Sequence, residues 1–212
     1  MTEAQQLAFD HHMQKWAINT VGAINSEQLF GNSNPLVIEI GFGMGDSLAQ
    51  MAQANPDKNF IGLEVHQPGI GRLLNLVEKQ QIQNIRVING DAVEWLEKHF
   101  TDASIARANI YFPDPWHKRK HHKRRLIQTP FIDLLASRMQ TDGLLHVATD
   151  WQPYANDISK IMENHPQFKN IADSGLYANA AKLGRPQTKF ESRGVKLGHG
   201  VWDLAYKKQV EP

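Results

Sequence analysis

Residues 36–47 of the chain read LVIEIGFGMGDS, a short apolar run followed by a glycine-rich turn. Apolar residues then recur with helical spacing over residues 46–54. The run predicts a buried strand and the periodic stretch predicts a helix. Glycine lets the backbone turn sharply and approach a ligand closely. The glycines expected to do so are Gly41, Gly43 and Gly45. This stretch therefore predicts the first strand, turn and helix of a ligand-binding sheet.

The rest of the chain repeats this alternation of apolar runs and helical patterns. Further strands are predicted at 60–63, 85–88, 108–112, 144–148 and 201–206. Helices are predicted at 46–54, 66–81, 92–99, 130–140 and 152–164. The order predicts a doubly wound α/β fold, a largely parallel sheet that binds ligands beyond the carboxyl ends of its strands. No helical pattern precedes the last run, so we expect an antiparallel strand there.

The composition is that of an ordinary folded protein. The 212 residues are 41% hydrophobic and 21% charged, and they include no cysteine. These values are typical of globular proteins, and the missing cysteine excludes disulfides and thiolate zinc sites. No apolar run approaches the ~20 residues of a membrane-spanning helix, and the polar start does not resemble a signal peptide. We expect a cytoplasmic protein with no membrane association and a single domain over residues 36–212, preceded by an N-terminal extension over residues 1–35.

Positive charge is concentrated in one segment. The formal net charge of the chain is +1, yet residues 107–125 hold seven Lys or Arg against one acid, a local net charge of +6. The remainder of the chain is correspondingly negative. This distribution is typical of a protein that meets a polyanion through one face.

Acidic residues follow three successive predicted strands, at Glu39, Glu64 and Asp91. Glu64 lies 23 residues after Gly41, where an acid accepts hydrogen bonds from ribose hydroxyls. Glu39 suits an ammonium group and Asp91 an adenine amino group, although each acid also suits a helix cap or a turn. A dinucleotide is the alternative ligand. Asp46 disfavours it, because an acid at a helix N-terminus repels a pyrophosphate.

The fourth predicted strand runs into the segment PDPWHKRKHHKRR, residues 113–125. Two prolines stiffen the backbone on either side of Asp114. The basic residues that follow suit phosphate oxygens, with binding that weakens as salt rises. Three histidines lie in the segment, but the neighbouring cations oppose metal binding, and we expect no metal.

The motifs EIGFGMG, GLEVHQPG, PDPWHKRKHHKRR, HVATDW, TKFESRG and LGHGVWDL occur in order between residues 36 and 206. Together they resemble the bacterial tRNA (guanine-N7-)-methyltransferase family. The resemblance implies a Rossmann-like class I fold with a mostly parallel seven-stranded sheet and helices on both faces. It also implies methyl transfer from S-adenosylmethionine (SAM) to ring nitrogen 7 of a guanosine in the tRNA variable loop, conventionally position 46, with S-adenosylhomocysteine as the second product.

The resemblance assigns roles residue by residue. Asp114 is implied as the catalytic residue. The implied cofactor contacts are Glu39, Gly41, Gly43, Gly45, Glu64, Asp91, Ala92 and Asp114. The implied substrate contacts are Lys118, Asp150, Thr188, Lys189, Phe190 and Glu191. The implied RNA-interacting residues are Lys120, His121, His122, Lys123, Arg124 and Arg125. No obligate protein partner is implied, and we expect a monomer or a homodimer.

The N-terminal residues depart from the family pattern. Members often begin with an arginine-rich segment, whereas residues 1–35 hold one Lys, three acids and no Arg. This shifts the expected RNA contacts to residues 117–125. An inactive tRNA-binding protein of the same fold is the alternative interpretation. Retention of the acids and of the TKFE tetrad favours an enzyme.

The expected reaction needs alignment more than a strong base, because ring nitrogen 7 of guanine already carries a free lone pair. Positioning of this kind contributes several kcal/mol. We expect the carboxylates of Asp114 and Asp150 to stabilise the positive charge that develops on the purine.

Overall fold

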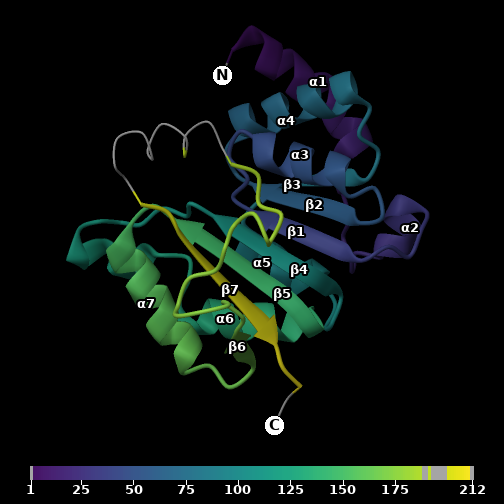
Figure 1. Cartoon of the computed structure of the whole chain (residues 1–212). Coiled ribbons are helices and arrows are strands. Elements are labelled where there is room, and N and C mark those ends of the chain that lie inside the picture. Colours follow the sequence, from purple (N-terminus) through teal and green to yellow (C-terminus); the bar gives the residue numbers. More distant parts are fainter. Residues whose placement is uncertain (1, 188–190, 192–199, 211–212) are drawn as a thin grey trace.

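The computed structural model describes residues 2–187, 191 and 200–210 of the chain, which form one mixed sheet with helices on both faces (Figure 1). The strand order is β3-β2-β1-β4-β5-β7-β6, and β7 runs antiparallel to both of its neighbours. The described strands are β1 (Leu36–Ile40), β2 (Asn59–Glu64), β3 (Ile85–Asn89), β4 (Ile105–Tyr111), β5 (Met139–Thr149), β6 (Phe168–Asn170) and β7 (Trp202–Lys208). The predicted α/β sheet and its late antiparallel strand are confirmed.

Two helical layers cover the sheet. One hydrophobic cluster packs α1 (Glu3–Trp16), α3 (Asp46–Ala54) and α4 (Gln67–Gln80) against one face. A second cluster packs the opposite face, and its helices are α2 (Ser26–Phe30), α5 (Ala92–His99), α6 (Thr129–Arg138) and α7 (Gln152–Glu163). The five predicted helices are confirmed at nearly the predicted limits, since the apolar spacing that predicted them is the spacing that packs on the sheet. The short strand β6 and the helices α1 and α2 were not predicted.

The N-terminal helix packs onto the rest of the fold rather than lying apart from it. Figure 1 shows α1 alongside α4. The approach is close at Gly71, where an added Cβ would lie 2.2 Å from the carbonyl oxygen of Gln5. The Trp16 indole donates a hydrogen bond of 2.5 Å to Glu78 of α4, and Ile18 N donates to the Val87 carbonyl in β3. This segment therefore packs onto the fold, with Ala8, Trp16 and Ile18 buried.

Part of the sheet face that carries α1, α3 and α4 is polar instead of apolar. Its polar side chains come from β4, β5 and β7 and are Arg107, Asn109, Tyr111, His146 and Asp203. The helix α3 reaches the edge of this area, where the Met51 sulfur accepts a hydrogen bond of 3.9 Å from the Asn109 amide. Residues 178–187 lie over it, held in part by a hydrogen bond from Ala178 N to the Asp203 carbonyl. The loop leads toward the cavity described below.

No described helix is both long enough and apolar enough to cross a membrane.

Candidate functional site

The glycine turn after β1 is braced by Glu64 at the end of β2. Gly43 N donates a hydrogen bond of 2.8 Å to one carboxylate oxygen of Glu64. The other oxygen accepts from Val65 N at 2.8 Å and His66 N at 2.9 Å. An added Cβ on Gly69 in α4 would lie 1.9 Å from the Gly43 carbonyl oxygen, so α4 packs directly on the turn. The turn is thus a fixed part of the fold.

A cavity of about 430 Å³ opens beside this turn. Its floor includes Glu39 and its wall includes Tyr111 and Phe112 from the end of β4. Residues 41–47 close one side, and Pro186 and Gln187 line it from the long loop. The volume falls in the range of ~300 to 1,000 Å³ that small-molecule sites occupy.

Glu39 is buried on this floor and only 2% exposed. Its Oε2 has no hydrogen-bond partner among the described residues. Burial raises the pKa of Glu39 from 4.5 to about 8, while the charge of Arg107 acts in the opposite direction. A buried carboxyl group without a partner destabilises the fold. Such a group in a cavity is a candidate ligand contact.

Two further acids near the strand ends, the predicted cofactor contact Asp91 and the helix-terminal Asp46, are engaged within the protein. Asp91 caps α5 by accepting a hydrogen bond of 3.0 Å from Glu94 N. It therefore acts as the helix cap that was its alternative role, and Ala92 is the first residue of that helix. Asp46 pairs with Arg72 through two hydrogen bonds of 3.2 and 2.7 Å. Arg72 offsets the charge of Asp46, which makes the predicted repulsion of a pyrophosphate weaker than the sequence suggested.

Asp114 lies in a sharp turn that leaves the carboxyl end of β4. The turn begins at Phe112, with φ +52°, and ends at Trp116, with φ +45°. Aromatic residues rarely adopt this conformation, which costs on the order of 1 kcal/mol each. Phe112 N donates to the Ala148 carbonyl of β5, and the exposed Asp114 side chain accepts from Trp116 N at 3.2 Å. The strained turn presents the carboxylate at the sheet edge where ligands bind.

The basic segment forms a short 3-10 helix, η1 (Arg119–Arg124), directly after this turn. His121 and His122 are half-buried, and the exposed cations of the segment are Lys118, Arg119, Lys120, Lys123 and Arg124. The Arg124 guanidinium lies 5.0 Å from the Trp116 ring centre. Among the described residues, no group of His, Asp and Glu is placed to hold a metal ion.

Arg125 requires a correction to its predicted RNA contact. The residue is only 5% exposed. Its Nε donates to the Pro115 carbonyl at 2.8 Å, and Nη1 donates to Asp157 of α7 at 2.5 Å. The guanidinium also lies 4.5 Å from the Tyr154 ring centre. Its bonding capacity is directed into the protein, where it ties the two ends of the basic segment together.

The loops after β4 and β5 meet at this edge. Asp150 follows β5 and is exposed, and the ring of its neighbour Trp151 lies 4.4 Å from the ring of His117, edge to face. The fold therefore places Asp150 close in space to the loop that carries Asp114 and Lys118.

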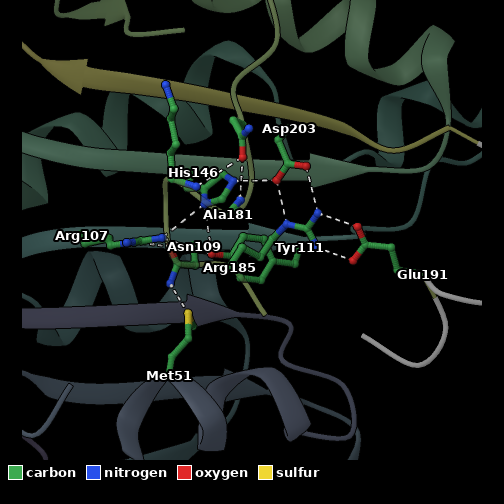
Figure 2. A network of polar contacts seen from close by, with 11 residues as sticks. Met51, Arg107, Asn109, Tyr111, His146, Ala181, Arg185, Glu191 and Asp203 are labelled. Carbon is green, nitrogen blue, oxygen red and sulfur yellow. Dashed lines mark hydrogen bonds and ion pairs between the residues drawn. The ribbon is translucent and has the colours of Figure 1, made fainter. Parts of the chain in front are cut away.

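The TKFE tetrad is described only at its last residue, because Thr188, Lys189 and Phe190 lie outside the described residues. Glu191 forms a paired salt bridge with Arg185, with hydrogen bonds of 2.6 and 2.8 Å (Figure 2). Sequence reasoning did not find Arg185, which no motif marks. Its partners are Glu191, six residues further along the chain, and Asp203 on β7.

Comparison with known proteins identifies the chain. A family model described as "Putative methyltransferase" matches residues 33–204. A SAM-dependent O-methyltransferase from Thermotoga maritima shares the fold, with a TM-score of 0.57 and 14% identity over 97% of this chain and 72% of that chain. The tRNA (guanine-N(7)-)-methyltransferases of Alcanivorax borkumensis and Methylobacillus flagellatus are 48% and 49% identical over 99% of this chain and cover 88% and 87% of those proteins. The fold and site define a Rossmann-like class I methyltransferase. At this identity over nearly the full length, the chain belongs to the tRNA (guanine-N(7)-)-methyltransferase family.

Proposed function

We propose that this protein transfers a methyl group from SAM to ring nitrogen 7 of a guanosine in the tRNA variable loop, position 46, yielding 7-methylguanosine. The observation that carries the proposal is that one continuous segment at the carboxyl end of β4 contributes to both parts of the site. Tyr111 and Phe112 line the cavity together with Glu39, whose Oε2 has no hydrogen-bond partner among the described residues, and the same segment continues to Asp114 and the exposed cations. A small-molecule site and a polyanion site therefore adjoin.

The described residues fit the cofactor. Glu39 supplies a buried acceptor for the ammonium group. Gly41, Gly43 and Gly45 line the cavity, and the open space beside Gly41 and Gly43 allows close approach. Glu64 already accepts three backbone N–H groups. A carboxylate has about four lone-pair sites, so it retains capacity for a ribose hydroxyl. The remaining proposed contacts of the cofactor are Asp91, Ala92 and Asp114.

When bound, SAM supplies the methyl group as an electrophile on its sulfonium. The protein's part is to hold the guanine in line with that group, which contributes several kcal/mol without a strong base. Asp114 and Asp150 lie on the loops that meet at this edge, and we assign them to the positive charge that develops on the purine. Asp114 is exposed in the described structure, so a bound base would lower its contact with water.

The RNA contacts are assigned to the exposed face of the basic segment. Lys118, Asp150 and the TKFE tetrad, residues 188–191, are proposed to contact the target nucleotide. The phosphate contacts are proposed for Lys120, His121, His122, Lys123 and Arg124. Arg125 is reassigned to hold the segment in shape, because its guanidinium is buried against Pro115 and Asp157.

We place the protein in the cytoplasm, since the chain has no cysteine and its proposed substrate is tRNA. We treat residues 36–212 as the methyltransferase domain. Residues 1–35 form an N-terminal extension that packs onto this domain through α1.

The test is incubation with SAM labelled in its methyl group and bulk tRNA that lacks 7-methylguanosine. We expect label to appear as 7-methylguanosine after digestion to nucleosides. Binding of tRNA without transfer would instead identify an inactive tRNA-binding protein of the same fold. A thermal-shift comparison separates the cofactor classes, because S-adenosylhomocysteine should raise the melting temperature and NAD should not.

A further inference from the structure

Arg185, to which the proposed function gives no role, is the centre of a buried polar cluster (Figure 2). We call it the Arg185 cluster, and its described members are Arg107, Asn109, Tyr111, His146, Arg185, Glu191 and Asp203. The Arg185 side chain is 1% exposed. It donates two hydrogen bonds to Asp203 on β7, at 2.7 and 2.9 Å, and two to Glu191, at 2.6 and 2.8 Å.

The same guanidinium also contacts the wall of the cofactor cavity. It lies 5.7 Å from the ring centre of Tyr111 and 5.5 Å from that of Phe112. These distances are within the range of cation–π attraction. Phe112 is the strained residue at which the turn toward Asp114 begins. Arg185 thus joins β7, the tetrad residue Glu191 and the turn that carries Asp114.

The charges of the cluster balance around this residue. Arg185 faces the anions Asp203 and Glu191. Arg107 instead donates to the uncharged acceptors Asn109, Tyr111 and His146. Burial lowers the pKa of His146 and so favours a neutral ring, whereas the hydrogen bond to Asp203 acts in the opposite direction. Arg107 donates to His146 Nδ1 at 3.2 Å, so Nε2 carries the proton and donates to Asp203 at 2.8 Å. Arg185, Asp203 and Glu191 therefore each have a partner of opposite charge.

A buried ion-pair cluster is weak evidence for stability alone, because well-packed apolar residues often replace one without loss. The geometry here favours a role in positioning. A bidentate guanidinium fixes the orientation of a carboxylate as well as its distance. Arg185 orients two carboxylates at once, and the next residues in the chain, Pro186 and Gln187, line the cavity.

We propose that Arg185 is a positioning residue for methyl transfer, which acts by fixing Glu191 and residues 178–187 against the cofactor cavity. This inference rests on the proposed function, since Glu191 is assigned there to the target nucleotide. The ammonium group of lysine keeps the charge of Arg185 but cannot form the planar fork to Asp203 and Glu191.

The experiment compares wild type, Arg185→Lys, Glu191→Gln and the double variant with unmodified tRNA. Rates are expressed per site that binds S-adenosylhomocysteine in calorimetry, so a misfolded fraction does not lower them. We expect Arg185→Lys to reduce kcat by about 10- to 100-fold, as small misplacements do. In the Glu191→Gln background, Arg185→Lys should reduce kcat by less than about threefold, because the carboxylate that Arg185 orients has already been removed.

Arg138→Lys is the matched control. Arg138 pairs with Asp102 and donates to the Leu96 carbonyl, away from the cavity residues. We expect its kcat to stay within about twofold of wild type. If Arg185→Lys does not fold, Asp203→Asn takes its place in the cycle, because it removes the charge that anchors Arg185 to β7.

Three results would overturn the inference. The first is a per-site kcat for Arg185→Lys within threefold of wild type, whatever its melting temperature. The second is an equal loss in both backgrounds, which would mean that Arg185 and Glu191 act independently. The third is a wild type that binds S-adenosylhomocysteine but forms no 7-methylguanosine, which would remove the proposed function together with the inference.

Discussion

Replacement of Glu39 by glutamine should stabilise the protein in the absence of cofactor. The substitution keeps the size of the side chain and removes an ionisable group that is 2% exposed and lacks a partner on Oε2. Burial raises the pKa of Glu39 from 4.5 to about 8. Below pH 4.5 the folded and unfolded states both carry the proton, so the raised pKa has no cost there.

Between pH 4.5 and 8 the unfolded chain ionises first, and wild-type stability falls by about 1.4 kcal/mol per pH unit from this group. The loss amounts to about 3 kcal/mol at pH 7 and levels off above pH 8. Glu39→Gln should escape this loss. Its gain at pH 7 has about 3 kcal/mol as its upper limit, since the new amide must itself find hydrogen-bond partners.

Urea unfolding of both proteins at intervals from pH 4 to pH 8.5 measures this difference. Glu94→Gln is the control, because Glu94 is an exposed partner of Lys98 on α5. Its effect should stay within about 0.5 kcal/mol. A Glu39→Gln variant that is less stable than wild type at pH 7, or a difference that does not change with pH, would refute the reasoning.

The same carboxyl predicts a proton release on cofactor binding. An ammonium group beside Glu39 lowers its pKa, so wild type should release close to one proton near pH 7. Calorimetry with S-adenosylhomocysteine in buffers of different ionisation heat measures this number. Glu39→Gln should release none. An equal release from both proteins would place the ammonium group elsewhere.

Three further substitutions test other parts of the site and the fold. Asp114→Ala should lower kcat by at least about 100-fold with an unchanged melting temperature, and activity within tenfold of wild type would remove its catalytic role. Alanine at both Lys123 and Arg124 should weaken tRNA binding and flatten its salt dependence, because fewer counterions are released, and an unchanged slope would place the RNA elsewhere. Gly71→Ala should separate α1 from α4 and lower the melting temperature by several degrees, because its Cβ would lie 2.2 Å from the Gln5 carbonyl oxygen. Wild-type melting of Gly71→Ala would show that α1 packs more loosely.

In the basic segment, residues of the same type differ in burial and therefore in their proposed roles. Arg124 and Arg125 are neighbours of the same type, yet Arg124 is exposed and Arg125 is 5% exposed. The difference arises from α7, where Asp157 meets the Arg125 guanidinium. RNA affinity and loop shape are thus assigned to adjacent residues of one charged run.

The sequence by itself determined strands β1 to β5 and β7, helices α3 to α7, and the acids at the strand ends. Strand and helix periodicity and glycine-turn chemistry are local, so LVIEIGFGMGDS at residues 36–47 was enough to predict β1, its turn and α3. The helix α1 was missed, although Thr2 and Gln5 form a capping box at its start. Its packing on α4 depends on Gly71, and the need for glycine there is visible only when the two helices are seen side by side.

Tertiary structure alone decided which charged groups are buried and which partners they have. Arg185 meets Asp203 from β7, and Asp203 in turn meets His146 from β5, so the Arg185 cluster joins segments that no local pattern connects. A charged side chain is stable in the interior only where groups of opposite charge converge on it. That convergence is a property of the folded sheet, and for this reason the cluster, the burial of Arg125 and the unpartnered oxygen of Glu39 emerge only in three dimensions.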